Sequence, residues 1–169
     1  TTSTVFGKLA GVALESGASN NVLIGELSGQ ALSTGDHNTI VGYNSGNDLV
    51  DGQKNIFMGV GAGATTTDVD NAIIIGADAG GANLTAAADG SIFIGAEAGL
   101  GTTTGSSCTF IGFNAGKANT TGDEHTFIGF EAGIAHNHTE GNSNSNGSTF
   151  IGYRAGYEAL MGSQDNTFV

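Results

Sequence analysis

A short motif recurs along the whole chain and constrains its fold more than any other feature. Its clearest copy, STFIGYRAG, occupies residues 148–156. The glycines at the centres of successive copies are Gly7, Gly25, Gly42, Gly59, Gly76, Gly95, Gly112, Gly129 and Gly152, and a tenth copy begins at residues 166–169. Their spacing is nearly constant, and only the last interval is much longer. A period of about 17 residues is too short for a helix-turn-helix unit but suits one small β-coil, so the repeat predicts a β-solenoid.

The three residues before each central glycine have the composition of a β-strand. With that glycine numbered 0, position −3 is always Thr, Val or Ile, and positions −2 and −1 are always apolar. Side chains alternate along a strand, so position −2 faces one side while −3 and −1 face the other. Only one side can look into a coil of this size. The other apolar side needs a cover, and a second copy of the same chain is the economical one.

Like side chains are expected to stack on one another from coil to coil, at the sheet spacing of about 4.8 Å. The residues of this predicted core ladder are Phe57, Phe93, Phe110, Phe127, Phe150, Ile75, Ile94, Ile111, Ile128 and Ile151. Position +3 is Ala or Ser in every complete copy, as a tightly filled inner corner requires. Positions 0 and +4 are glycine, which indicates close approach of another backbone or of the Phe ladder.

Composition narrows the range of partners. The formal net charge is −12, with only four Lys and Arg residues, so the chain would repel nucleic acid and anionic lipid. No apolar run is long enough to insert into a membrane. The lone Cys108 lies in a column held mostly by Asn or Ser and is expected to be inert. We interpret residues 1–169 as a single repeat domain and, because the last motif is cut short, as a segment of a longer fibre polypeptide.

The repeats resemble those of a known group of fibrous proteins. The copies at residues 38–46 (NTIVGYNSG) and 108–116 (CTFIGFNAG) resemble repeats in bacteriophage tail fibres and related trimeric fibres. They are also similar to the head repeats of trimeric autotransporter adhesins. The resemblance covers the whole chain and implies an all-β homotrimer of the β-roll or triple-stranded β-helix type, with about ten rungs of about 17 residues. The period is longer than the usual autotransporter coil and the −2 column more aromatic, which favours the phage fibre.

The expected function is structural and non-enzymatic. The resemblance implies an extracellular attachment segment, on a virion tail fibre, that mediates host-surface recognition through a glycan or protein receptor. The alternative is the head of a bacterial adhesin on the outer surface of the cell. An ice-binding solenoid is a third class, which would need a continuous Thr array, whereas Thr alternates with Ile at position −3 and does not occur at −1.

The interval between Gly129 and Gly152 contains the longest insertion. Such a polar segment should bulge outward and is the candidate receptor loop. Its candidate residues are His136, Asn137, His138, Glu140, Asn142, Asn144 and Asn146. A His-x-His pair repeated in three chains is similar to the sets that hold iron or nickel in phage fibres. An outward loop would keep three copies apart, so no metal and no cofactor is expected.

Two acidic features have the residue types of functional sites. Asp78 and Glu97 stand at position +2 of adjacent copies, and stacked carboxylates would suit a retaining glycosidase. No neighbour in the sequence would raise the pKa of either group, so a solvated acidic stripe is the favoured interpretation. Residues 68–71 (DVDN) place oxygen ligands at alternate positions but lack the remainder of a calcium loop.

The +1 column predicts an aromatic ladder. Phe113, Phe130 and Tyr153 follow one another at this position. They could stack on sugar rings or be buried between chains. Burial is favoured because Phe outnumbers Tyr and the chain has no Trp.

Overall fold

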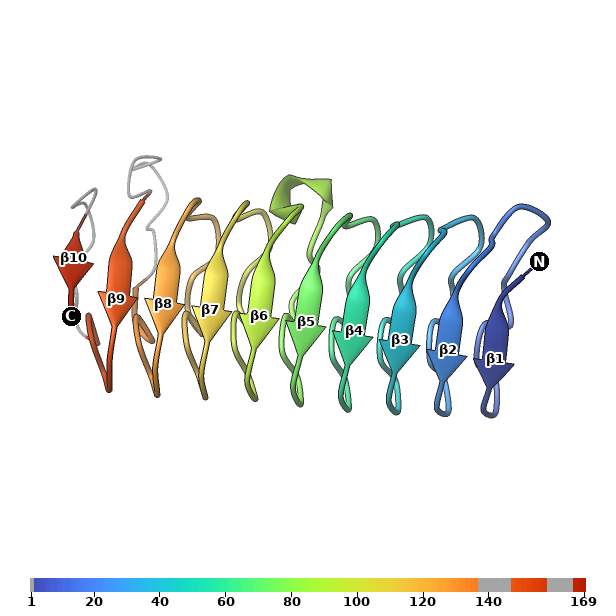
Figure 1. The fold of residues 1–169 in the computed structure, drawn as a ribbon, viewed down its shortest axis with the longest axis horizontal. Coiled ribbons are helices and arrows are strands. Elements are labelled where there is room, and N and C mark those ends of the chain that lie inside the picture. Colours follow the sequence, from blue (N-terminus) through green and yellow to red (C-terminus); the bar gives the residue numbers. More distant parts are fainter. Residues whose placement is uncertain (1, 137–146, 158–165) are drawn as a thin grey trace.

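Ten short parallel strands form one sheet in chain order, as Figure 1 shows. The computed structural model describes residues 2–136, 147–157 and 166–169. The strands are β1 (Thr4–Phe6), β2 (Val22–Ile24), β3 (Thr39–Val41), β4 (Ile56–Met58), β5 (Ile73–Ile75), β6 (Ile92–Ile94), β7 (Thr109–Ile111), β8 (Thr126–Ile128), β9 (Thr149–Ile151) and β10 (Thr167–Phe168). Among the described residues, one 3-10 turn, η1 (Ala86–Ala88), lies between β5 and β6. In the described part of the chain, no helix has the length and apolarity needed to cross a membrane.

The register pairs each residue with its equivalent in the next copy, for example Phe110 of β7 with Phe127 of β8. Consecutive strands of the same chain are neighbours throughout, so every coil is completed within one chain. The predicted β-solenoid is therefore confirmed as about nine turns of about 17 residues.

The turn after each strand depends on the central glycine. The strands end at position −1, so they do not extend through the glycine, where the chain bends at a positive φ of 133° in Gly95. A Cβ added to Gly95 would lie 2.4 Å from the carbonyl oxygen of Gly112 in the next coil. Real Cβ atoms do not come so close to backbone, which confirms that glycine is required here by the approach of another chain segment.

Hydrogen bonds between coils continue outside the strands. The Gly46 N–H donates to the Ala62 carbonyl at 2.9 Å, and the Asp48 N–H donates to the Ala64 carbonyl at 3.0 Å. Both bonds join segments that lie in turns. The stack is therefore held by backbone bonds around the coil and not by the three-residue strands alone.

The −2 column forms the centre of the interior. Phe93, Phe110, Phe127 and Phe150 are fully buried, and their ring centroids are 5.2, 4.9 and 4.7 Å apart in that order. A Cβ at Gly116 would lie 2.6 Å from the Phe110 ring, so the +4 glycine makes room for the aromatic ladder as predicted. Stacked rings of this kind add to the stability gained from apolar burial.

The Ile residues of the predicted core ladder lie elsewhere. Ile75, Ile94, Ile111 and Ile128 are half-buried and Ile151 is exposed, because position −1 points away from the coil. Within one chain the core is therefore the −2 column together with the inner corner at +3, which is buried from Ser28 to Ala132.

A second interior column lies opposite the −2 column. It contains Leu32, Leu49, Thr66, Leu84, Thr102, Asn119 and His136, all buried. In the described coils, those with an aliphatic −2 residue carry Leu in this column, whereas the four with Phe57, Phe93, Phe110 or Phe127 at −2 carry Thr, Asn or His. The His136 ring contacts the Phe127 ring of its own coil, with centroids 5.4 Å apart. Two aliphatic side chains of similar size thus fill one type of coil, and a Phe with a polar partner of smaller volume fills the other, as close packing requires.

Position −4 carries a ladder of side-chain acceptors. The Asn38 N–H donates to Oδ1 of Asn21 at 2.9 Å, and the Asn55 N–H donates to Oδ1 of Asn38 at 3.0 Å. The amide group of each Asn also donates to a carbonyl in the following turn, such as Asn38 Nδ2 to Gly52 O at 2.8 Å. These buried polar groups therefore connect neighbouring coils.

Candidate interaction surface

Three outward columns make one apolar surface along the solenoid. Positions −3 and −1 form the outer face of the sheet, and position +1 follows directly after the glycine turn. We call these columns together the outer band. Exposed large apolar side chains in the outer band are Phe6, Ile24, Tyr43, Ile56, Met58, Val60, Phe113, Phe130, Ile151, Tyr153 and Val169. An apolar surface that runs the length of a chain in this way is typical of an interface.

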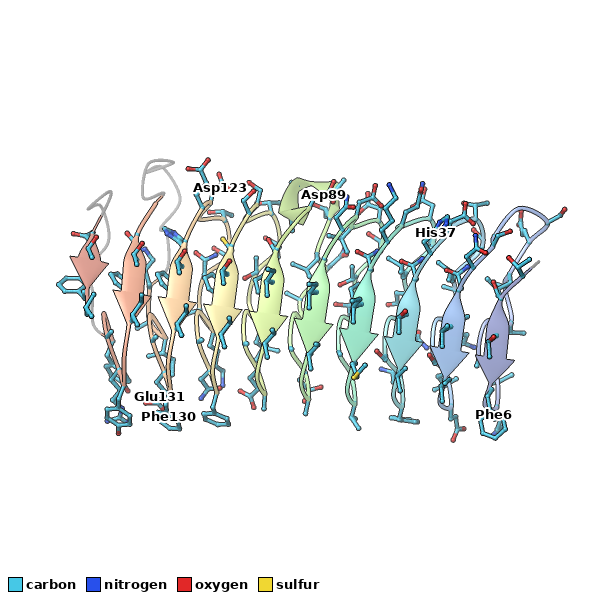
Figure 2. All side chains as sticks on the ribbon, in the orientation of Figure 1. Phe6, His37, Asp89, Asp123, Phe130 and Glu131 are labelled. Atoms are coloured by element: carbon cyan, nitrogen blue, oxygen red, sulfur yellow. The ribbon has the colours of Figure 1, made fainter. Side chains whose placement is uncertain are left out.

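The charged residues lie away from this surface. No copy has a charged residue at −3 or −1, and at +1 only Lys8 and Glu26 in the first two copies are charged. The polar edge opposite the glycine turns carries acidic and polar side chains, among them Asp89, Asp123 and His37 in Figure 2. Although the net charge of the chain is −12, Glu26 is therefore the single acidic residue in the outer-band columns of the sequence.

The predicted aromatic ladder is present at the C-terminal end of the band. Phe113 and Phe130 stack with centroids 5.3 Å apart, and Phe130 and Tyr153 stack at 5.4 Å. The rings are 44%, 42% and 71% exposed, and Phe130 projects at the edge of the molecule in Figure 2. Because the rings are nearly parallel, their faces cover one another and their edges point outward. Sugars bind to aromatic faces, so this geometry favours packing against another apolar surface.

Ion pairs flank the aromatic ladder. Arg154 Nε donates to Glu131 Oε2 at 2.6 Å, and this bond raises the pKa of Arg154. The Arg154 guanidinium also lies 5.3 Å from the Tyr153 ring centroid and 4.9 Å from that of Tyr157. Sequence reasoning missed Tyr157, since position +5 holds a different residue type in almost every copy and has no pattern to indicate it.

Three acidic residues of the two candidate features, Glu97, Asp68 and Asp70, have structural partners. Glu97 at position +2 forms an ion pair with Lys117 of the next coil. Asp68 Oδ1 accepts the Ala86 N–H at 3.0 Å, and Asp70 Oδ1 accepts the Gln53 N–H at 2.7 Å. These carboxylates thus join neighbouring coils, and no group of three metal-binding side chains occurs among the residues that the structure describes.

The candidate receptor loop is only partly described. His136, its first residue, is 1% exposed and lies inside the coil, with its ring nearly perpendicular to those of Phe127 and Phe150. The expectation that its side chain faces outward is therefore wrong, because the second interior column continues through this position. The remaining candidates, Asn137, His138, Glu140, Asn142, Asn144 and Asn146, lie outside the described residues.

Cys108 is buried in the −4 column. Its Sγ donates to the Gly122 carbonyl at 3.1 Å, and burial raises the pKa of the thiol to about 12. The thiol is therefore protonated near neutral pH, which is the behaviour of an inert cysteine.

Comparison with known proteins gives no relative: no protein-family model, no curated protein and no solved structure matches this chain. The fold itself defines the class, which is the parallel β-solenoid repeat proteins.

Proposed function

We propose that this chain is a structural and attachment segment of a trimeric extracellular fibre, most similar in its repeats to a phage tail fibre. The observation that supports the proposal best is the apolar outer band along a regular rod, which is uncharged from the third copy onward. The proposal names a second and a third copy of the same chain as the partners that cover it.

Periodicity argues for a copy of this chain as the partner. The outer band repeats once per coil in every column, with a spacing set by the sheet at about 4.8 Å. A parallel copy has the same spacing, so all of its coils can pack in register at once. A partner without this repeat would match the surface at only a few places.

Threefold symmetry comes from the family resemblance and fits the shape of the outer band. In a closed ring each chain contacts its two neighbours through two different patches. The sheet face at −3 and −1 and the adjacent column at +1 are two such patches, since the glycine turn lies between them. Burial between chains would also cover the edges of Phe113, Phe130 and Tyr153, which one chain leaves exposed.

A stiff trimeric rod can hold receptor contacts in three copies, so that weak contacts to a cell-surface glycan or protein gain avidity. The bacterial adhesin head remains the alternative within the same architecture. It differs in the downstream stalk and membrane anchor, which the sequence of the full polypeptide would show.

The test is the mass of the particle in solution. Light scattering should give three times the chain mass of 16.7 kDa. Ile111→Lys places a charge at the outer band and should lower the mass to that of one chain, because a buried unpaired charge costs several kcal/mol. Thr104→Lys, at an exposed position in the preceding turn, is the matched control and should leave the trimer intact.

A single-chain mass for the unmodified protein would contradict the proposal. If that single chain also showed thermal hysteresis, the ice-binding class would replace it.

A further inference from the structure

His125 occupies a place in the −4 ladder where the side chain accepts a hydrogen bond. The Ser148 N–H donates to Nδ1 of His125 at 3.1 Å. In earlier coils the same bond runs from the Asn38 and Asn55 amides to the Oδ1 atom of an Asn. An amide oxygen accepts at any pH, whereas an imidazole nitrogen accepts only while it carries no proton. The bond to Ser148 therefore requires a neutral His125.

The side chains of His125 and His136 are both buried and both contact aromatic rings. The two side chains are 0% and 1% exposed, and their ring centroids are 4.9 Å apart in an edge-to-face arrangement. His125 stacks on the Phe127 ring at 5.1 Å, and the His136 ring is nearly perpendicular to the rings of Phe127 and Phe150, each at 5.4 Å. A charge on either imidazole would lose its hydration in this interior. Both observations favour the neutral form in the closed coil.

In the described part of the chain, the other titratable residues next to His125 are Cys108, Asp123 and Glu124. Cys108, in the same column of the preceding coil, is neutral because burial raises its pKa to about 12. Asp123 accepts the N–H and the hydroxyl of Ser106 at 2.7 and 3.0 Å, and the side chain of Glu124 is exposed. Carboxyl groups ordinarily titrate about two pH units below imidazole. Imidazole titration can therefore be followed between about pH 5.5 and 8.

We propose that His125 and His136 form an acid-sensitive latch. While both imidazoles are neutral they hold the coils of β8 and β9 closed, and their protonation favours opening of these coils. Coils of a solenoid can open locally, since each contacts only its neighbours. An opened coil frees the imidazoles, which then take up protons below about pH 6.5. Stability is complete above this pH and falls as the pH decreases. The opening equilibrium rises about tenfold per pH unit for one such imidazole and about a hundredfold for two.

Hydrogen exchange at single amides tests the latch in the intact protein. The reporter is the Ser148 amide, which donates to His125, and the internal reference is the Asn55 amide, which makes the same bond to Asn38. Between about pH 7.5 and 5.5, the protection factor of Ser148 should fall at least tenfold, while that of Asn55 stays constant. Equal changes at the two amides, or no change at either, would overturn the proposal.

The chain itself supplies the substitutions for a second test. His125→Asn copies Asn21 and Asn38 of the −4 ladder, and His136→Asn copies Asn119 of the second interior column. In the double variant the protection of Ser148 should no longer depend on pH over this range. His37→Asn, at an exposed position, is the control and should behave as the unmodified protein.

The measured quantity is the change in the Ser148 protection factor with pH. The double variant therefore tests the proposal even if it is less stable at every pH. An acid-induced loss at Ser148 as large as in the unmodified protein would show that these imidazoles do not form the latch. The outcome is independent of the fibre assignment, because the contacts that carry the proposal lie within one chain.

Discussion

The proposed compensation between the two interior columns can be tested by giving one coil the residues of its neighbours. The coil after β4 contains Phe57 and Thr66, whereas the coils on either side contain Ile40 with Leu49 and Ile74 with Leu84. The double variant Phe57→Ile, Thr66→Leu therefore gives three successive coils of the same type. Phe57 and Thr66 are fully buried, and Thr66 Oγ1 has no hydrogen-bond partner among the described residues.

The expected energies follow from the atoms removed and added. Phe57→Ile deletes three carbons, about half of the loss in a Phe→Ala change, and should cost about 2 kcal/mol. Thr66→Leu alone crowds a coil that still contains Phe, at a cost of about 1 to 3 kcal/mol, partly offset by removal of the unpaired hydroxyl. In the double variant the larger Leu fills the space left by Phe. The total cost should therefore stay within about 1 kcal/mol of zero, with a coupling energy of about 2 kcal/mol.

The free energy of unfolding should be measured for the unmodified protein, the two single variants and the double variant, by guanidinium unfolding followed by far-UV circular dichroism. These four values give the coupling energy between the two sites. Amide exchange in the altered coil should accompany this measurement, because a repeat array does not have to unfold in two states. Phe57→Ile combined with Thr102→Leu is the control, since the two sites lie two coils apart and their costs should add. Additive costs in the Phe57 and Thr66 pair as well would refute the idea that the two columns compensate each other.

Two further predictions concern single positions inside or beside the coil. Gly95→Ala should destabilise the protein by about 3 kcal/mol or more in thermal or chemical unfolding, because its Cβ would meet the Gly112 carbonyl. Gly17→Ala, at the same φ of 133° but with open space around it, isolates the backbone strain and should cost less. The Cys108 thiol should resist alkylation in the native protein near pH 8, since its pKa is raised to about 12. Because that pKa lies above the ordinary value of 9.0, stability should fall between pH 9 and 12, and Cys108→Ser, which copies Ser91, should remove this loss.

The sequence was sufficient to predict the strands and the close contacts of the small residues. Ten phased copies repeat the same alternation, so the inward and outward columns follow from strand geometry alone. The stacking of Phe113, Phe130 and Tyr153 follows as well, because residues in equivalent positions become neighbours when coils stack in register. Because the motif repeats, its local pattern also predicts contacts between residues far apart in the sequence.

Contacts across a coil were harder to predict than contacts along the stack. The polar sequence after His136 predicts an outward loop that includes this residue, yet His136 closes the interior against Phe127. The signal that would have placed it was the exchange of Leu for Thr or Asn in the preceding coils that have Phe at position −2. That signal lies in a correlation between two columns, and neither column shows it when considered alone.

The longer coils show where this architecture can change without disturbing the rest. The coil between β5 and β6 is longer than the coils on either side, and its additional residues lie between Ala82 and Asp89, at the polar edge where η1 projects in Figure 1. Ile73 still pairs with Ile92, and after the longest interval Thr126 still pairs with Thr149. Length differences are thus absorbed within a single coil and do not accumulate along the rod. Residues can therefore be inserted or peptides grafted at this polar edge, while the outer-band residues of successive coils stay in register along the rod.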